Sequence, residues 1–187
     1  MLQVLREMPA IESSNVKLNT PVTYDAREVA NFVLDQCSAS GREISNLSLQ
    51  KIVYFCHSWS LAILGRPLFR EQFEAWPLGP VMPYLYREFR DFGDRPITAR
   101  AMKLNKSNGL KSVAEYAFSA DVMDLLKQTT ETYSKLTPFQ LVELTHAANG
   151  PWEQVWHHNK KINAGMRIAD ELILSFYSAQ FRPKFAQ

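Results

Sequence analysis

The sequence predicts a mainly α fold: a compact single helical domain with a small β element. Apolar residues recur at spacings of three and four along several stretches, which is typical of amphipathic helices. The chain holds only seven glycines, and the closest of them are 14 residues apart, which disfavours a β fold rich in hairpins. A length of 187 residues is enough for one domain with a real hydrophobic core.

The N-terminal part carries little pattern before the first helix. Residues 1–23 contain two prolines, and we expect an N-terminal extension with at most one short helix, at Leu2–Met8. Ala26–Ala39 is predicted to be a helix because its apolar residues recur at helical spacing. Asp25 can cap the start of this helix, and Gly41 can close its end.

The strongest helix is predicted over Leu47–Leu64. Its apolar residues cover more than one face, so we expect this helix to lie at the centre of the domain. Ser45 or Asn46 can serve as the N-cap, whereas Gly65 and Pro67 end the helical run.

A stretch rich in proline and glycine follows. Gln72–Trp76 alternates polar and apolar residues, as a short strand does. A helix cannot continue through the prolines that come next. Pro83 can occupy the first turn of another helix, which we expect to run to Phe92 and end at Gly93.

The last part of the chain is predicted to be helical. Residues 94–118 read as irregular, with short strand pieces at Ile97 and Ala117–Phe118. We expect the domain to span residues 24–180 and a short tail to occupy 181–187. The helices predicted after the irregular region are Ala120–Tyr133, Phe139–Ala148, Trp152–His158 and Met166–Ala179.

The net charge of the whole chain gives little support for a polyanionic partner. The chain has 21 basic and 19 acidic residues and a net charge of +2, so no strong field for nucleic acid or an anionic membrane is expected. Residues 87–111 hold seven basic and three acidic residues. That run can be a solvated loop, a surface that binds an acidic patch on a partner protein, or a nucleic-acid site. No apolar stretch reads as a signal peptide or a membrane span, so a cytoplasmic location is expected.

The sequence offers no catalytic constellation. The glycines are too far apart for a phosphate-binding loop, and there is no Gly-x-Ser-x-Gly elbow. Cys37 and Cys56 fall on apolar helix faces and read as core thiols. Glu143 and His146 have a di-iron spacing without the second copy that such sites need. We therefore expect no catalytic residues, no metal, no cofactor and no enzymatic activity.

Two ordered motifs resemble a known family. The segment that starts at Leu49, LQKIVYFCHSWSLA, resembles the LQKLLYYAQGWHLA helix of the Panacea domain, which defines a family of antitoxins. The segment that starts at Phe73, FEAWPLGPVMPYLY, is similar to the second family signature, in which F-x-A-W-x-x-G-P-V leads into a helix bearing LY. Leu144-Thr145-His146, the following Pro151-Trp152 and then Ile162 also fit. The match extends from about Tyr24 to Phe176.

The resemblance implies a protein that neutralises a cognate toxin by direct binding, with the toxin encoded by an adjacent gene. Toxins of this family include relatives of alarmone synthetases and membrane-active peptides. One member delivers its toxin to a AAA+ protease, so a proteolytic adapter is an alternative. Some members carry a DNA-binding unit, for which residues 1–23 are too short. A nucleic-acid-binding regulator that uses residues 87–111 is the remaining alternative.

The motif residues fall into two groups. Trp76, beside Pro77, can be either a lid on the core or a binding platform. Gln50 is a polar residue inside an apolar signature, so we expect it to tie its helix to the loop at Trp76–Val81. The residues expected to contact the toxin are Trp76, Tyr84, Tyr86 and Arg87. Those expected to support the fold are Leu49, Gln50, Lys51, Tyr54, Trp59, Gly79, Pro80, Val81, His146 and Trp152.

Overall fold

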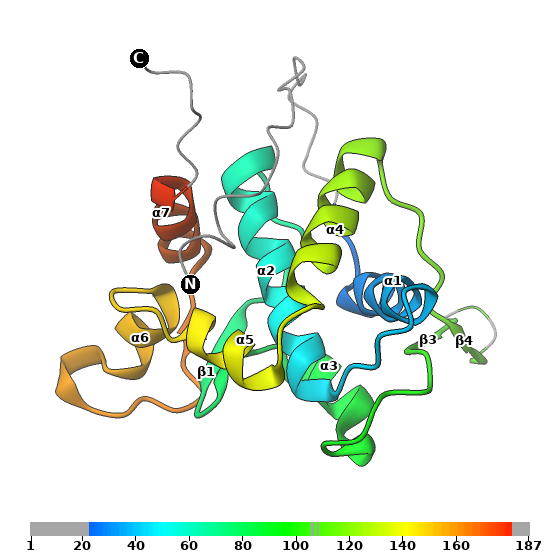
Figure 1. Cartoon of the computed structure of the whole chain (residues 1–187), viewed down its shortest axis with the longest axis horizontal. Helices are drawn as coiled ribbons and strands as arrows, with labels where there is room; N and C mark the ends of the chain where they lie inside the picture. Colours follow the sequence, from blue (N-terminus) through cyan, green and yellow to red (C-terminus); the bar gives the residue numbers. More distant parts are fainter. Residues whose placement is uncertain (1–22, 106, 108, 181–187) are drawn as a thin grey trace.

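Helix α2 (Asn46–Leu64) runs through the middle of the molecule, and the other helices pack around it (Figure 1). The computed structural model describes residues 23–180 except 106 and 108. The predicted short helix at Leu2–Met8 and the tail at 181–187 therefore lie outside the described residues. Ser45 caps the start of α2, and Gly65 ends it in the left-handed conformation, with φ of +65°.

Seven α-helices and a few short antiparallel strands make up the described part of the chain, so the mainly α prediction is confirmed. Helix α1 (Ala26–Ala39) matches its predicted bounds, and Asp25 with Glu28 forms a capping box at its start. The remaining helices are α3 (Pro83–Phe89), α4 (Ala120–Tyr133), α5 (Pro138–Thr145), α6 (Pro151–Trp156) and α7 (Asp170–Gln180). Short 3-10 turns follow α3 and α6, at Arg90–Phe92 and His158–Lys160.

The strands form two separate small sheets. Strand β1 (Phe73–Trp76) lies between β2 (Gly79–Val81) and β5 (Arg167–Ile168), and both pairings are antiparallel. Strands β3 (Met102–Leu104) and β4 (Lys111–Val113) form a second antiparallel hairpin at the opposite side of the molecule (Figure 1).

The core lies where α2 meets α4 and α7, and it is rich in aromatic rings. Trp59 is buried and its Nε1 donates a hydrogen bond of 3.0 Å to the hydroxyl of Tyr133. The ring of Phe55 stacks on Tyr133 at 4.0 Å, and Tyr177 meets Trp59 edge to face. Such packing combines a large apolar contact with one satisfied polar group.

Several predicted boundaries were wrong. The strand pieces expected at Ile97 and Ala117–Phe118 lie outside strands, because the second hairpin forms at β3 and β4 instead. The helix expected at Phe139–Ala148 ends at Thr145, and the helix expected at Trp152–His158 ends at Trp156. The last helix starts at Asp170 rather than Met166, because Arg167–Ile168 pairs with β1.

Candidate functional site

Three polar side chains on one side of α2 hold the backbone of the segment that follows β1. We call these three side chains, Asn46, Gln50 and Lys51, the clamp. They are buried although they belong to an apolar helix, and buried polar groups need partners. The clamp contacts are Asn46 Nδ2 to the Tyr86 carbonyl at 3.0 Å, the Met82 N–H to Gln50 Oε1 at 3.0 Å, and Lys51 Nζ to the Pro80 carbonyl at 2.8 Å.

Lys51 is fully buried, and its ammonium group donates to a neutral carbonyl. Burial disfavours the charged form and lowers the pKa of Lys51 to about 7. Gly79 packs directly against this side chain with φ of +100°. A Cβ atom on Gly79 would lie 2.6 Å from Thr145 Oγ1 and 3.0 Å from Lys51 Nζ. Glycine is therefore required here both by the backbone conformation and by the close approach.

A ladder of aromatic rings extends from the clamp toward the surface. The His146 ring stacks on Trp152 with a centroid distance of 3.6 Å, and Trp156 continues the stack at 5.4 Å. Trp152 Nε1 donates to the Trp76 carbonyl at 2.9 Å, which ties α6 to β1. Burial, together with the charge of Lys51, lowers the pKa of His146 to about 4, so its imidazole is neutral at pH 7.

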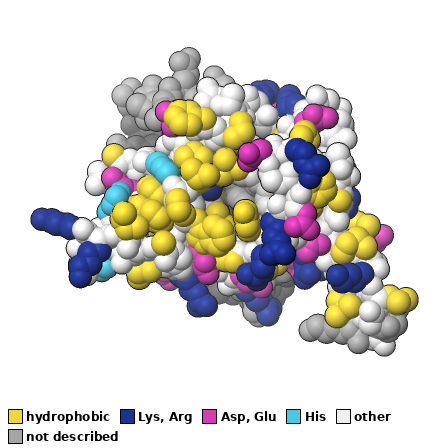
Figure 2. Space-filling view, turned by 90° about the horizontal axis from the view of Figure 1, so that it is seen from below, with side chains coloured by type: hydrophobic (Ala, Val, Ile, Leu, Met, Phe, Trp, Pro, Cys, Tyr) yellow, Lys and Arg dark blue, Asp and Glu magenta, His cyan; other side chains and the backbone are white. Residues whose placement is uncertain are grey.

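Apolar side chains reach the surface above the clamp. Trp76 is half-buried and packs against Tyr86 at a centroid distance of 5.1 Å. Leu78, in the turn between β1 and β2, is 55% exposed, and Phe139, in the first turn of α5, is 70% exposed. Figure 2 shows hydrophobic side chains gathered over this end of the molecule. Helix α6 packs against β1, and α5 packs against β2. We call the outward apolar residues of this neighbourhood, Trp76, Leu78, Tyr86, Phe139 and Trp156, the signature face.

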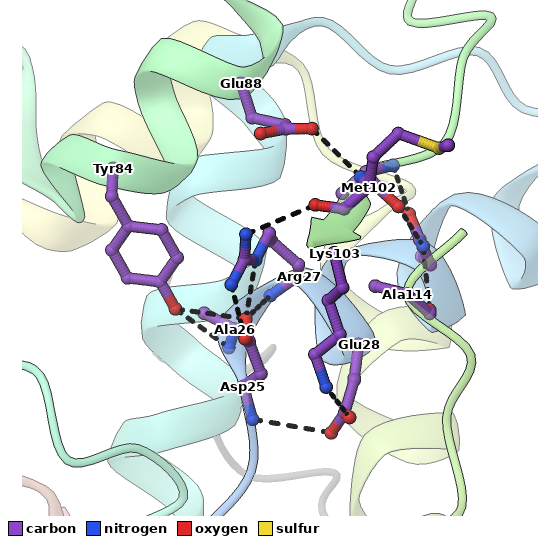
Figure 3. A network of polar contacts seen from close by, with 11 residues as sticks. Asp25, Ala26, Arg27, Glu28, Tyr84, Glu88, Met102, Lys103 and Ala114 are labelled. Atoms are coloured by element: carbon purple, nitrogen blue, oxygen red, sulfur yellow. Dashed lines mark hydrogen bonds and ion pairs between the residues drawn. The ribbon is translucent and has the colours of Figure 1, made fainter. Parts of the chain in front are cut away.

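Tyr84 belongs to a different network (Figure 3). Its hydroxyl accepts a hydrogen bond of 3.0 Å from the N–H of Ala26 and donates to Asp25 at 3.4 Å. Burial raises the pKa of Asp25, but hydrogen bonds and charge from Arg27 outweigh this effect and leave the pKa below its usual value. Tyr84 therefore connects α3 to the start of α1, on a different side of α3 from Tyr86.

The four residues expected to contact a toxin are thus divided. Trp76 and Tyr86 lie together, whereas Tyr84 holds α1. Arg87 is exposed on α3, next in sequence to Tyr86. Of the residues expected to support the fold, Leu49, Tyr54, Trp59 and Val81 are buried hydrophobic residues of the interior.

Sequence reasoning missed several members of this site. The sequence marks Asn46 only as a possible cap, but Ser45 fills that position and Asn46 joins the clamp. No motif marks Leu78 or Phe139 as exposed, although a leucine between Pro77 and Gly79 is an unusual choice for a turn. The expected tie of Gln50 to Trp76–Val81 is made one residue later, at Met82.

Both cysteines of the chain lie in the interior of the described structure. Cys37 and Cys56 are buried, and burial raises the pKa of both thiols, which makes them poor nucleophiles. Within residues 23–180, apart from 106 and 108, no group of three or more His, Cys, Asp or Glu is placed to hold a metal ion. None of the helices described has both the length and the apolar character that a membrane span requires.

Comparisons with known proteins agree with the arrangement of the two signatures. Residues 49–153 match the family model described as antitoxin SocA-like, Panacea domain. The chain is 38% identical over 154 residues to Antitoxin SocA of Caulobacter vibrioides (strain NA1000 / CB15N), a match that covers 82% of each chain. No solved structure matches this chain. The chain belongs to the SocA-like antitoxin family with a Panacea domain.

Proposed function

We propose that this protein is an antitoxin that neutralises a cognate toxin by direct protein–protein binding, and that the signature face is the surface that meets the toxin. The observation that carries the proposal is the exposed apolar cluster above the clamp, in a chain that belongs to an antitoxin family. Aromatic and apolar side chains on a rigid support are typical of the centre of protein interfaces.

The clamp supports this assignment because it fixes the backbone under the face. It holds the carbonyls of Pro80 and Tyr86 and the N–H of Met82. A surface that is already ordered loses less conformational entropy when a partner binds. The protein contributes no reactive group in this proposal and acts by covering the toxin.

The basic run at 87–111 supports a nucleic-acid regulator less well. Four of the six basic residues that the structure describes in this run bond to groups of this chain. These contacts are Arg90 with Asp91, Arg95 with the carbonyls of Asp91 and Phe92, Arg100 with Asp35, and Lys103 with Glu28. Charges satisfied within the fold are less available to phosphates.

Co-expression with the product of the adjacent gene tests the proposal. We expect that product to stop growth when expressed alone and the wild-type protein to restore growth. The double variant L78S/F139S should bind the toxin at least ~10-fold more weakly, because each buried apolar side chain contributes about 1.5–3 kcal/mol. Binding is measured by calorimetry with an inactive form of the toxin.

The matched control is L104S/V113S, which alters two apolar residues of similar exposure, 57% and 46%, in the other hairpin. This control should bind like the wild type. Equal loss in both double variants, or a toxin that stays lethal beside the wild type, would contradict the proposal. Immunoblots of the toxin separate the two modes of action: a stable toxin level indicates blocking, whereas faster decay indicates the proteolytic adapter.

A further inference from the structure

Residues 157–167, which connect α6 to β5 and include the first residue of that strand, form a concentrated patch of positive charge. We call it the cationic loop. It carries Lys160, Lys161 and Arg167, together with two histidines, and no Asp or Glu occurs between Glu153 and Asp170. All five of these basic side chains are exposed. In the described part of the chain none of the three Lys and Arg residues forms an ion pair, although Arg167 lies opposite Glu74 in the sheet.

The loop is held in one shape by its own polar groups. Asn163 Nδ2 donates to the carbonyls of His158 at 2.9 Å and Lys161 at 2.8 Å, and its backbone N–H donates to Trp156 at 2.9 Å. Asn159 and Lys160 both have positive φ, +56° and +58°. Asparagine adopts this conformation readily, whereas a lysine adopts it rarely and needs the support of surrounding contacts. The charges are therefore presented on a shaped support.

The cationic loop borders the signature face. The loop begins directly after Trp156. Its far end is bonded to Ala75, the neighbour of Trp76. The N–H of Gly165 donates to the Ala75 carbonyl at 2.7 Å, and the N–H of Ala75 donates to the Met166 carbonyl at 2.8 Å. In Figure 2, Lys and Arg side chains project at the edge of the apolar gathering, on the side where Figure 1 places this loop. An apolar centre with a charged rim is the usual layout of a protein interface.

The chemistry of the loop favours an acidic protein surface as its partner. Ile162 is 69% exposed and Met166 is 46% exposed, so the loop offers apolar contacts between its charges. Phosphate groups would use the charges and leave these apolar side chains unpaired. The small net charge of the whole chain, +2, gives little long-range attraction for nucleic acid.

We propose that the cationic loop is the charged rim of the toxin-binding surface, and that the toxin presents a cluster of carboxylates beside the apolar patch that covers the signature face. This inference rests on the proposed function. Opposite charges across an interface raise the association rate more than they slow dissociation. The loop therefore steers the toxin onto the signature face.

The test is a kinetic comparison with the toxin encoded by the adjacent gene, immobilised in an inactive form. K160E/K161E should lower the association rate at least ~10-fold in 50 mM NaCl and change the dissociation rate less than ~3-fold. In 500 mM NaCl the difference should shrink to under ~3-fold, because salt screens exposed charges. Thermal melts of the variants should match that of the wild type.

K111E/K127E makes the same change in charge at two exposed lysines away from the loop and serves as the matched control. If K160E/K161E associates like this control while the wild type neutralises the toxin, the inference is overturned and the proposed function stands. If the wild type itself binds no toxin, both are overturned. The last arm of the test measures binding of a 20-base-pair DNA duplex. Tight binding of that duplex, lost only in K160E/K161E, with toxin kinetics unchanged, would assign the loop to nucleic acid instead.

Discussion

The two hairpins of this protein are attached to the helical body in different ways. The β1–β2 hairpin is held from beneath by buried side chains of α2, which bond to backbone atoms of the segment. The β3–β4 hairpin is held at its base by the buried amide of Asn31, which bonds to the backbones of Ala101 and Ala114. Its strands are held nearer the surface, where Lys103 pairs with Glu28 and Arg27 donates to the Met102 carbonyl (Figure 3). Buried hydrogen bonds hold a segment in one position, whereas exposed ion pairs contribute little and weaken with salt.

The difference indicates which hairpin can serve as a rigid binding platform. A segment that is bonded through its backbone in the core resists displacement when a partner pulls on its side chains. We therefore expect substitutions at the first hairpin to have large effects on stability, and matching substitutions at the second to have small ones.

The largest expected effect comes from alanine at a glycine of each hairpin. Gly79→Ala should lower the free energy of unfolding by about 3 kcal/mol or more, because the new Cβ would lie 2.6 Å from Thr145 Oγ1. Gly109→Ala, at φ of +69° with no atom near the new Cβ, should cost about 1 kcal/mol from backbone strain alone. Urea denaturation measures both, and equal costs would remove the contrast between the hairpins.

The second expected effect is a pH dependence of the free energy of unfolding, which arises from Lys51. The pKa of this lysine is about 7 in the folded protein and near 10.5 in the unfolded chain. The unfolded state thus binds more protons between these values, so the free energy of unfolding rises with pH. Between pH 7.5 and 8.5 we expect a rise of about 1 kcal/mol from this group.

Lys51→Met should abolish this rise, as measured by urea denaturation across the same pH range. Gln50→Leu serves as the control, because it breaks the neighbouring bond to Met82 but keeps Lys51. Its stability should be lower by about 1–3 kcal/mol at every pH, with the wild-type slope retained. Parallel profiles for Lys51→Met and the wild type would show that the buried amine does not set the pH dependence.

The smallest expected effect concerns the ion pair of the second hairpin. Lys103→Met should lower the free energy of unfolding by less than about 1 kcal/mol in 50 mM NaCl, since both side chains of the half-buried pair keep contact with solvent. In 500 mM NaCl the loss should fall further. A loss above about 2 kcal/mol, unchanged by salt, would mean that this hairpin is held as firmly as the first.

The elements that the sequence predicts well are those with local signals. Helices α1 and α4 follow directly from apolar spacing, which the Asp25 cap reinforces at α1, so their bounds agree with the prediction. Strands β3 and β4 have no such signal, because all three residues of Lys111–Val113 are exposed and show no alternation. The amide of Asn31, on α1, bonds to the backbones of Ala101 and Ala114, a contact between residues far apart in the sequence.

The candidate site could be predicted only where its residues give a local signal in the sequence. Gln50 and Lys51 are polar residues in an apolar helix, and that local contrast points to specific partners. Which backbone atoms they reach depends on how the hairpin folds back over α2, which no local pattern records. Leu78 and Phe139 come from segments far apart in the sequence, and the contact between β2 and α5 exists only in the folded chain.

The clamp bonds to the main chain of residues 80–86 and leaves their side chains out of the bonding. Replacing an outward side chain such as that of Tyr86 therefore leaves the hydrogen bond to its own carbonyl in place. The surface can in this way exchange its residues while the frame beneath it stays the same. A fixed frame with interchangeable outward residues would let a single fold present surfaces of different shape.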